Sequence, residues 1–163
     1  MLQTSTILFL KNLAANNNKE WFDANRKTYE TAKTDYLNFV TTVLTELKKI
    51  DTSLEFLEPK KCVFRINRDV RFSKNKDPYK NNMGAHFTMG GKQQPSAGYY
   101  FHCQPNESFV GGGIWMPMAN ELKKIRQEVD YNYTEFKDIV FATKFKKIYS
   151  GLDTSAKLSR PQK

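Results

Sequence analysis

The spacing of apolar residues changes twice along the chain, and this pattern restricts the fold more than any other feature. Up to about residue 50, apolar residues recur at helical steps of three, four and seven. After Glu58-Pro59 they alternate with polar residues, as in half-buried strands, and after Pro117 the helical spacing returns. The order predicts an α+β fold, with a largely antiparallel sheet of hairpins packed against a long N-terminal helix and C-terminal helices. A length of 163 residues favours one domain over 1–163.

Two helices are predicted in the first block. The apolar spacing in TSTILFLKNLA indicates a helix over 4–14. Asn17, with Glu20 three residues later, has the spacing of a capping box. A second helix is therefore expected to run from about 18 to 50, roughly 50 Å at 1.5 Å per residue, long enough to pack across a sheet.

Alternating segments predict the strands. They are 64–72, which could be a half-buried strand or a bent ribbon, and 84–89, 99–103 and 108–116. In the first of them Arg68 interrupts the apolar positions, so its side chain is expected to point inward, as a buried ion pair or as a pocket residue. Helices should follow Pro117. The segment KFKKIYSG (144–151) is expected to form a short strand.

The composition is that of a soluble globular protein, with 39% hydrophobic and 26% charged residues and a mean hydropathy of −0.66. No segment approaches the roughly 20 apolar residues of a membrane span, and the first residues do not resemble a signal peptide. Cys62 and Cys103 lack the spacing of a disulfide framework or a zinc site. We therefore expect a cytoplasmic protein that makes no use of the membrane and has no metal site; the sequence identifies no cofactor.

Positive charge is concentrated in one segment. The chain carries a formal charge of +9, which favours nucleic acid, phosphorylated metabolites or acidic surfaces as partners, although an inert basic surface would give the same value. Residues 60–80 hold eight basic and two acidic residues, a local charge of +6. Arginine matches phosphate oxygens in a bidentate way. This segment is either a binding surface or a solvated polar face.

The sequence predicts a basic, aromatic-walled cleft for a phosphate-bearing small molecule. The candidate ligand-binding residues are Arg65, Arg68, Arg71, Lys74, Tyr79, Lys80 and Tyr100. The candidate catalytic residues for proton transfer are His102, His86 and Asp69. Strand alternation puts both histidines opposite to their apolar neighbours, so they are expected to share a face. The alternative is that both are structural.

The run Gly111-Gly112-Gly113 lies inside a predicted strand. It has neither the spacing of a P-loop nor that of a dinucleotide-binding loop. Glycines within a strand indicate a bulge, or the close approach of a ring, another backbone segment or a ligand.

Four segments in order resemble a known family. They are NNNKEWFDANRKTYE (16–30), FRINRDVRFSKNKDPYKNNMGAHF (64–87), SAGYYFHCQPNESFVGGGIWMP (96–117) and LKKIR (122–126). The chain resembles the uncharacterised family of bacteria and fungi known as domain of unknown function 2461. The resemblance implies a cytoplasmic α+β domain, usually somewhat longer, so that a C-terminal truncation is expected here. The positions it marks as characteristic are Asn17, Glu20, Trp21, Phe22, Arg65, Arg68, Asp69, Arg71, Phe72, Lys74, Pro78, Tyr79, Lys80, Gly98, Tyr99, His102, Gly113 and Pro117.

Two other functions fit the same residues. A nucleic-acid-binding module would use the same basic segment, although no helix-turn-helix, RNA-recognition or zinc signature is present. A scaffold without chemistry would instead expose an apolar patch for a partner protein. The sequence does not determine the oligomeric state or whether the protein is an enzyme.

Overall fold

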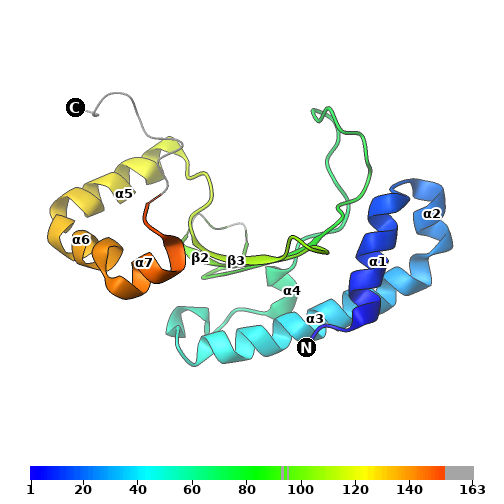
Figure 1. The fold of residues 1–163 in the computed structure, drawn as a ribbon, viewed down its shortest axis with the longest axis horizontal. Helices are drawn as coiled ribbons and strands as arrows, with labels where there is room; N and C mark the ends of the chain where they lie inside the picture. The colour runs from blue at the N-terminus through cyan, green and yellow to red at the C-terminus, as the bar shows by residue number, and fades with distance from the viewer. Residues whose placement is uncertain (93, 95, 153–163) are drawn as a thin grey trace. The chain divides into compact units, whose positions relative to one another are not determined.

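The computed structural model describes residues 1–92, 94 and 96–152 (Figure 1). These residues group into two compact units, which divide between Trp115 and Met116, and each is described by itself. The assignment of one domain over 1–163 stays a prediction. The first unit contains α1 (Thr4–Ala15), α2 (Lys19–Ala24), α3 (Arg26–Lys48), the 3-10 turn η1 (Thr52–Leu54), α4 (Pro59–Cys62), β1 (Met83–Thr88), β2 (Gly98–Cys103) and β3 (Phe109–Gly113). The second contains α5 (Ala119–Tyr131), α6 (Tyr133–Phe141) and α7 (Thr143–Tyr149).

The three strands form one antiparallel sheet in the order β1-β2-β3. The β1–β2 register runs from Met83↔Cys103 to Thr88↔Gly98. The β2–β3 register runs from Gly98↔Gly113 to His102↔Phe109. The predicted α+β class with an antiparallel sheet is confirmed. Among the described residues, no helix has the length and apolar character that crossing a membrane requires.

One face of the sheet, which we call the inner face, packs against α3 (Figure 1). The ring of Tyr36 stacks on Phe101 of β2 with 6.3 Å between centroids. The Tyr36 hydroxyl donates to the Met83 carbonyl at 3.2 Å. Ala85 and Phe87 of β1 are buried on this face. The aromatic stripe of α3 therefore covers the sheet, as the helical spacing predicted.

The second predicted helix is divided. Asn18, not Asn17, caps α2, because its side chain accepts from the Trp21 amide. The helical pattern breaks at Asn25, whose side chain donates to the Trp21 carbonyl at 2.9 Å. A short amide side chain that bonds to nearby backbone competes with helical pairing. The prediction of one helix from 18 to 50 was therefore wrong, and α3 begins only at Arg26.

No strand forms over 64–72. Two isolated bridges, Val63↔Ala85 and Asn67↔Tyr79, replace it. Lys80 donates its backbone N–H to Ile66 and Arg68 donates to Pro78, so residues 65–82 fold back on themselves. We call this segment the basic ribbon. The polar alternation was real, but its residues pair mainly within the segment and do not extend the sheet.

The predicted strand over 144–151 is also wrong, because these residues belong mostly to α7. Phe145 and Tyr149 contact each other at helical spacing, with 4.9 Å between ring centroids. Ser150 then ends the helix in the left-handed conformation. Contacts between side chains four residues apart favour the helix over a strand.

Candidate functional site

The outer face of the sheet, opposite α3, carries the polar groups of β1 and β2. His86 lies opposite Tyr100, and Tyr100 lies opposite Gly111 of β3. His102 lies between Gly84 and Phe109. Because directly paired residues share a face, both histidines are on the outer face with Tyr100. Strand alternation predicted that the two histidines share a face, and the register places them together.

Two glycines make room for these side chains. A Cβ at Gly84 would lie 2.8 Å from the Tyr100 hydroxyl oxygen. A Cβ at Gly98 would lie 2.8 Å from His86 Nε2 and 2.4 Å from the Phe87 carbonyl oxygen. Contacts this short do not occur at real Cβ atoms, so the arrangement of rings on the outer face depends on glycine at both positions.

A chain of hydrogen bonds runs from Tyr100 to Glu107. The Tyr100 hydroxyl and His102 Nδ1 are 3.0 Å apart, and His102 Nε2 and Gln104 Oε1 are also 3.0 Å apart. Gln104 Nε2 in turn donates to the Glu107 carboxylate. The carboxylate only accepts, so the Gln104 amide turns its oxygen toward His102. His102 Nε2 must then carry the hydrogen, and Nδ1 accepts a hydrogen bond from the Tyr100 hydroxyl.

Lys80 and Lys92 lie beside this face at the Phe64 ring, and Arg65 is close enough for its charge to act on Lys80. The backbone N–H of Phe64 donates to the Gly84 carbonyl, and its ring meets Tyr100 edge-on at 6.3 Å between centroids. Lys80 Nζ lies 5.4 Å and Lys92 Nζ 5.7 Å from the centre of the Phe64 ring. Burial, followed by the positive charges of Arg65 and Lys92, lowers the pKa of Lys80. Over residues 1–92, 94 and 96–152, none of these three cations forms an ion pair.

The tip of the basic ribbon is separate from the histidines. Asp69 accepts from Arg71 at 2.9 and 2.6 Å, which uses both carboxylate oxygens. This pairing lowers the pKa of Asp69. Lys74 is exposed at the same tip. The structure therefore pairs Asp69 with Arg71 and brings neither residue into contact with His86 or His102.

The base of the ribbon borders a polar hollow of about 350 Å³. Arg68 lines it, with Nη1 4.0 Å from an Asp77 oxygen and Nη2 3.3 Å from the Ser73 hydroxyl, and its role in a pocket stays a prediction. Lys80 also lines the hollow. The ring of Tyr79, in contrast, is buried and stacks on Phe22 with 3.9 Å between centroids. Tyr79 is nevertheless among the residues that line the hollow, so the prediction that it walls a ligand cleft stays a prediction.

Asn17 holds the ribbon against the turn between α1 and α2. Its side-chain amide donates to the Tyr79 carbonyl at 2.9 Å, and its oxygen accepts from the Tyr79 N–H at 3.1 Å. The amide thus pairs with both backbone groups of one residue, as a residue of a neighbouring strand would. This contact gives Asn17 a structural role that the capping-box spacing did not predict.

Replacing Asn17 with alanine should therefore loosen the ribbon. The variant leaves a partly buried N–H and C=O unpaired, which costs about 1–3 kcal/mol of the free energy of unfolding. Chemical denaturation measures the loss, and hydrogen exchange at the Tyr79 amide should accelerate. Asn16→Ala is the matched control, since the exposed Asn16 side-chain amide donates to the Asn12 carbonyl of its own helix. Equal stability of the two variants would contradict the role given to Asn17.

Lys92 and Gln104 are site residues that the sequence reasoning missed. Lys92 lies in the predicted loop GGKQQPS, and its side chain donates to the Val63 carbonyl. Nothing in the local sequence connects that loop with the basic ribbon. Gln104 carried a signal, since it follows His102 by two residues and continues the same strand parity.

The described residues give less support to a metal site or to a cysteine nucleophile. They contain no group of three or more His, Cys, Asp or Glu side chains that could hold a metal ion. Both cysteines are free and buried, and burial raises the pKa of Cys62 to about 11 and also raises the pKa of Cys103. Their thiols are protonated at neutral pH and enclosed, which suits packing and not nucleophilic catalysis.

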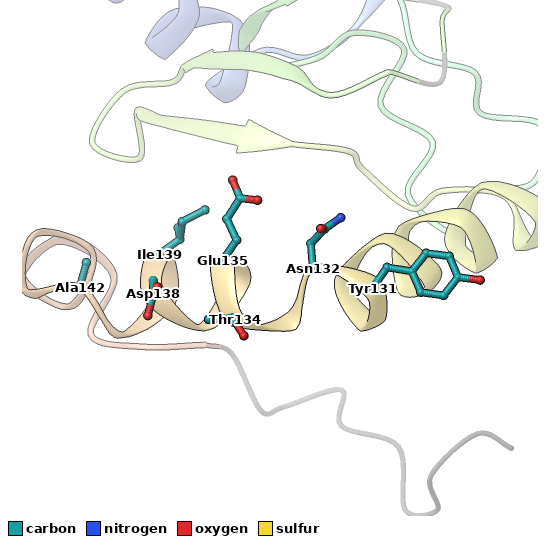
Figure 2. Close-up of a pocket in the computed structure, with 7 residues that line it drawn as sticks. All are labelled: Tyr131, Asn132, Thr134, Glu135, Asp138, Ile139 and Ala142. Atoms are coloured by element: carbon teal, nitrogen blue, oxygen red, sulfur yellow. The ribbon is translucent and has the colours of Figure 1, made fainter.

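A second hollow, of about 690 Å³, lies on the second unit along α6 (Figure 2). Its lining residues are Tyr131, Asn132, Thr134, Glu135, Asp138, Ile139 and Ala142. Figure 2 shows Glu135 and Ile139 extending from one side of the helix, while Thr134 and Asp138 point to the other. Polar groups that do not converge cannot fix the orientation of one ligand. The outer face of the sheet is therefore the stronger candidate.

Comparison with known proteins gives one match. A protein-family model described as "Conserved hypothetical protein (DUF2461)" matches residues 5–163. No curated protein matches the chain, and no solved structure matches it.

Proposed function

The chain belongs to the conserved hypothetical family DUF2461, and we propose that it binds a small phosphate-bearing molecule on the outer face of its sheet. The observation that carries this proposal is the pair Lys80 and Lys92 at the Phe64 ring, with Arg65 close enough for its charge to act on Lys80 and no ion pair to any of the three among the described residues. Repulsion among these cations destabilises the folded protein, and the negative charge of a bound anion would offset that repulsion. Phosphate oxygens accept charge-assisted hydrogen bonds from both arginine and lysine.

The rest of the ligand would lie over β2 and β3. Phe109 stacks on the imidazole of His102 with 4.8 Å between ring centroids, and it also borders Tyr100. Gly111, opposite Tyr100, has no atom within 4 Å of the place where a Cβ would be. Bare backbone beside aromatic side chains suits a flat or cyclic group on the ligand. This proposal replaces the buried Tyr79 ring with Phe64 and Phe109 as the aromatic residues of the site.

Calorimetric titration with inorganic phosphate and adenosine 5′-monophosphate tests the proposal. The double variant Lys80→Gln/Lys92→Gln should bind at least about tenfold more weakly, which corresponds to about 1.4 kcal/mol. Glutamine keeps side-chain length and removes the charge. Lys27→Gln, an exposed cation on α3, is the matched control and should bind like the natural sequence. The proposal fails if neither phosphate compound binds at millimolar concentration, or if the double variant binds with unchanged affinity.

Nucleic acid is the second candidate, and the ribbon tip favours it. Phe72 is 96% exposed and the Arg71 guanidinium carbon lies 5.8 Å from the centre of its ring. Exposed aromatic rings next to cations can stack the bases of a single strand. In that case a short oligonucleotide should bind with a steep salt dependence. Phe72→Ala should then weaken oligonucleotide binding more than Lys80→Gln/Lys92→Gln does, and the opposite order would favour the small ligand.

A further inference from the structure

We infer that Tyr100 is a reactive hydroxyl, activated by His102, which attacks the phosphorus of a phosphate ester held on the outer face. The inference rests on the proposed function for the identity of the electrophile. The activation of the hydroxyl rests on the geometry of Tyr100, His102, Gln104 and Glu107 alone.

The direction of the hydrogen bonds between Glu107 and Tyr100 indicates that His102 is oriented as a base. Glu107 orients the Gln104 amide, and Gln104 holds the hydrogen of His102 on Nε2. The lone pair of Nδ1 is thereby directed at the Tyr100 hydroxyl, 3.0 Å away. A nucleophile bonded to a base that is oriented by a third group is the general arrangement of nucleophilic catalysis. Gln104 acts as a positioning residue, since it contacts the base and not the nucleophile.

The surroundings of the Tyr100 hydroxyl also support its activation by a base. Partial burial raises the pKa of Tyr100, so the phenol is protonated at rest and needs a base to react. Gly84 leaves the space that the hydroxyl occupies, and any Cβ there would displace it. Tyr36, in contrast, donates to a backbone carbonyl. In the described part of the chain, Tyr100 is the one tyrosine whose hydroxyl is bonded to an imidazole.

The reaction balances without an additional reagent other than water. The Tyr100 oxygen forms a bond to phosphorus as the bond from phosphorus to the ester oxygen breaks. The phenol proton moves to His102 Nδ1 and then to the departing alcohol. Water next attacks the phosphotyrosine and gives its proton to His102, which returns it to the Tyr100 oxygen. The net reaction is hydrolysis of a phosphate ester to an alcohol and inorganic phosphate.

Labelling with benzenesulfonyl fluoride tests the activation directly. The phenol oxygen displaces fluoride at sulfur, and peptide mass spectrometry gives the rate at each of the eight tyrosines. Tyr100 should react at least about tenfold faster than Tyr131, although Tyr131 is 73% exposed, because general bases contribute about 100-fold or more. His102→Gln, which keeps hydrogen-bonding capacity without basicity, should bring the Tyr100 rate down to that of Tyr131. Tyr100→Phe should remove the fast adduct.

A second readout addresses the positioning residue. Nitrogen-15 NMR of the histidine side chains should show the Nε2–H tautomer for His102. Gln104→Leu should change that tautomer population and slow the labelling of Tyr100, and Gln104→Glu, which retains an acceptor for Nε2–H, should restore both. A residue with only a packing role would leave the tautomer unchanged. Equal thermal unfolding midpoints among the variants exclude misfolding as the cause.

The outcomes separate this inference from the phosphate-binding proposal. Lys27→Gln, the exposed cation on α3 that belongs to neither site, should leave sulfonyl fluoride labelling unchanged. A Tyr100 rate no greater than that of Tyr131, or one that is unchanged in His102→Gln, overturns the activation even if phosphate binds. Release of nitrophenol from 4-nitrophenyl phosphate, lost in Tyr100→Phe, is the expected result for the ester. Fast labelling without nitrophenol release overturns the phosphate ester as the electrophile.

Discussion

Replacing Phe22 with alanine should lower the free energy of unfolding by about 3–5 kcal/mol, the usual cost of removing a buried aromatic ring. Phe22 is 1% exposed and stacks on Tyr79 with an interplanar angle of 12°. Its ring also meets Tyr29 at 4.9 Å between centroids. The substitution removes the ring that joins α2, α3 and the basic ribbon and leaves a cavity among them. Urea denaturation of both proteins measures the difference.

Phe72→Ala is the matched control for this experiment. It removes the same ring from a side chain that is 96% exposed. Exposed substitutions usually change stability by no more than about 0.5 kcal/mol. If Phe22→Ala were no more destabilising than Phe72→Ala, the stacked contact with Tyr79 would not hold the ribbon in solution.

Gly98→Ala should lower the free energy of unfolding by about 1–3 kcal/mol, the usual cost of overpacking. The new methyl group would lie 2.4 Å from the Phe87 carbonyl oxygen, a backbone atom that moves only if β1 moves. It would also meet His86 Nε2 and the Cβ of Thr88, each at 2.8 Å. We expect the Thr88↔Gly98 end of the β1–β2 pairing to open. Thermal denaturation gives the stability, and amide exchange in β1 locates the damage.

Gly111→Ala provides the comparison on the neighbouring strand. No atom lies within 4 Å of the position that its methyl group would take. Alanine costs less backbone entropy than glycine in a strand, so the variant should match or slightly exceed the stability of the natural sequence. A similar loss at both positions would show that general glycine replacement, and not the contact with Phe87, causes the defect.

The order of the elements could be predicted because it depends on local spacing. Apolar periods of 3.6 and 2 identified α1, β1 and β2 nearly at their observed ends. The break at Asn25 and the absence of a strand over 64–72 could not be read in the same way. Asn25 competes through a side-chain bond to Trp21, and the ribbon pairs with itself through Asn67 and Tyr79. Both outcomes depend on which residue forms the hydrogen bond, and the spacing of apolar residues does not identify that residue.

The candidate site was only partly predictable for the same reason. Strand parity was sufficient to put His86, Tyr100 and His102 on one face, since register follows from alternation. Charge alone grouped Arg71 and Lys74 with Lys80, although Asp69 engages Arg71 at the exposed tip. Lys92 comes from a loop that folding brings to Phe64. Composition shows that cations are abundant, but it does not show which of them form no ion pair with an acidic side chain.

The Asn17–Tyr79 contact also has consequences for the order of folding. Its partners lie 62 positions apart, whereas each hairpin of the sheet closes between consecutive strands. Long loops close more slowly, so we expect the outer face with Tyr100 and His102 to form before the ribbon docks. Asn17→Ala should then accelerate unfolding more than it slows folding, and the reverse in stopped-flow kinetics would contradict this order. During folding, Tyr100 and His102 would thus reach their final positions first. Lys80 would join them beside the outer face last, when the basic ribbon docks.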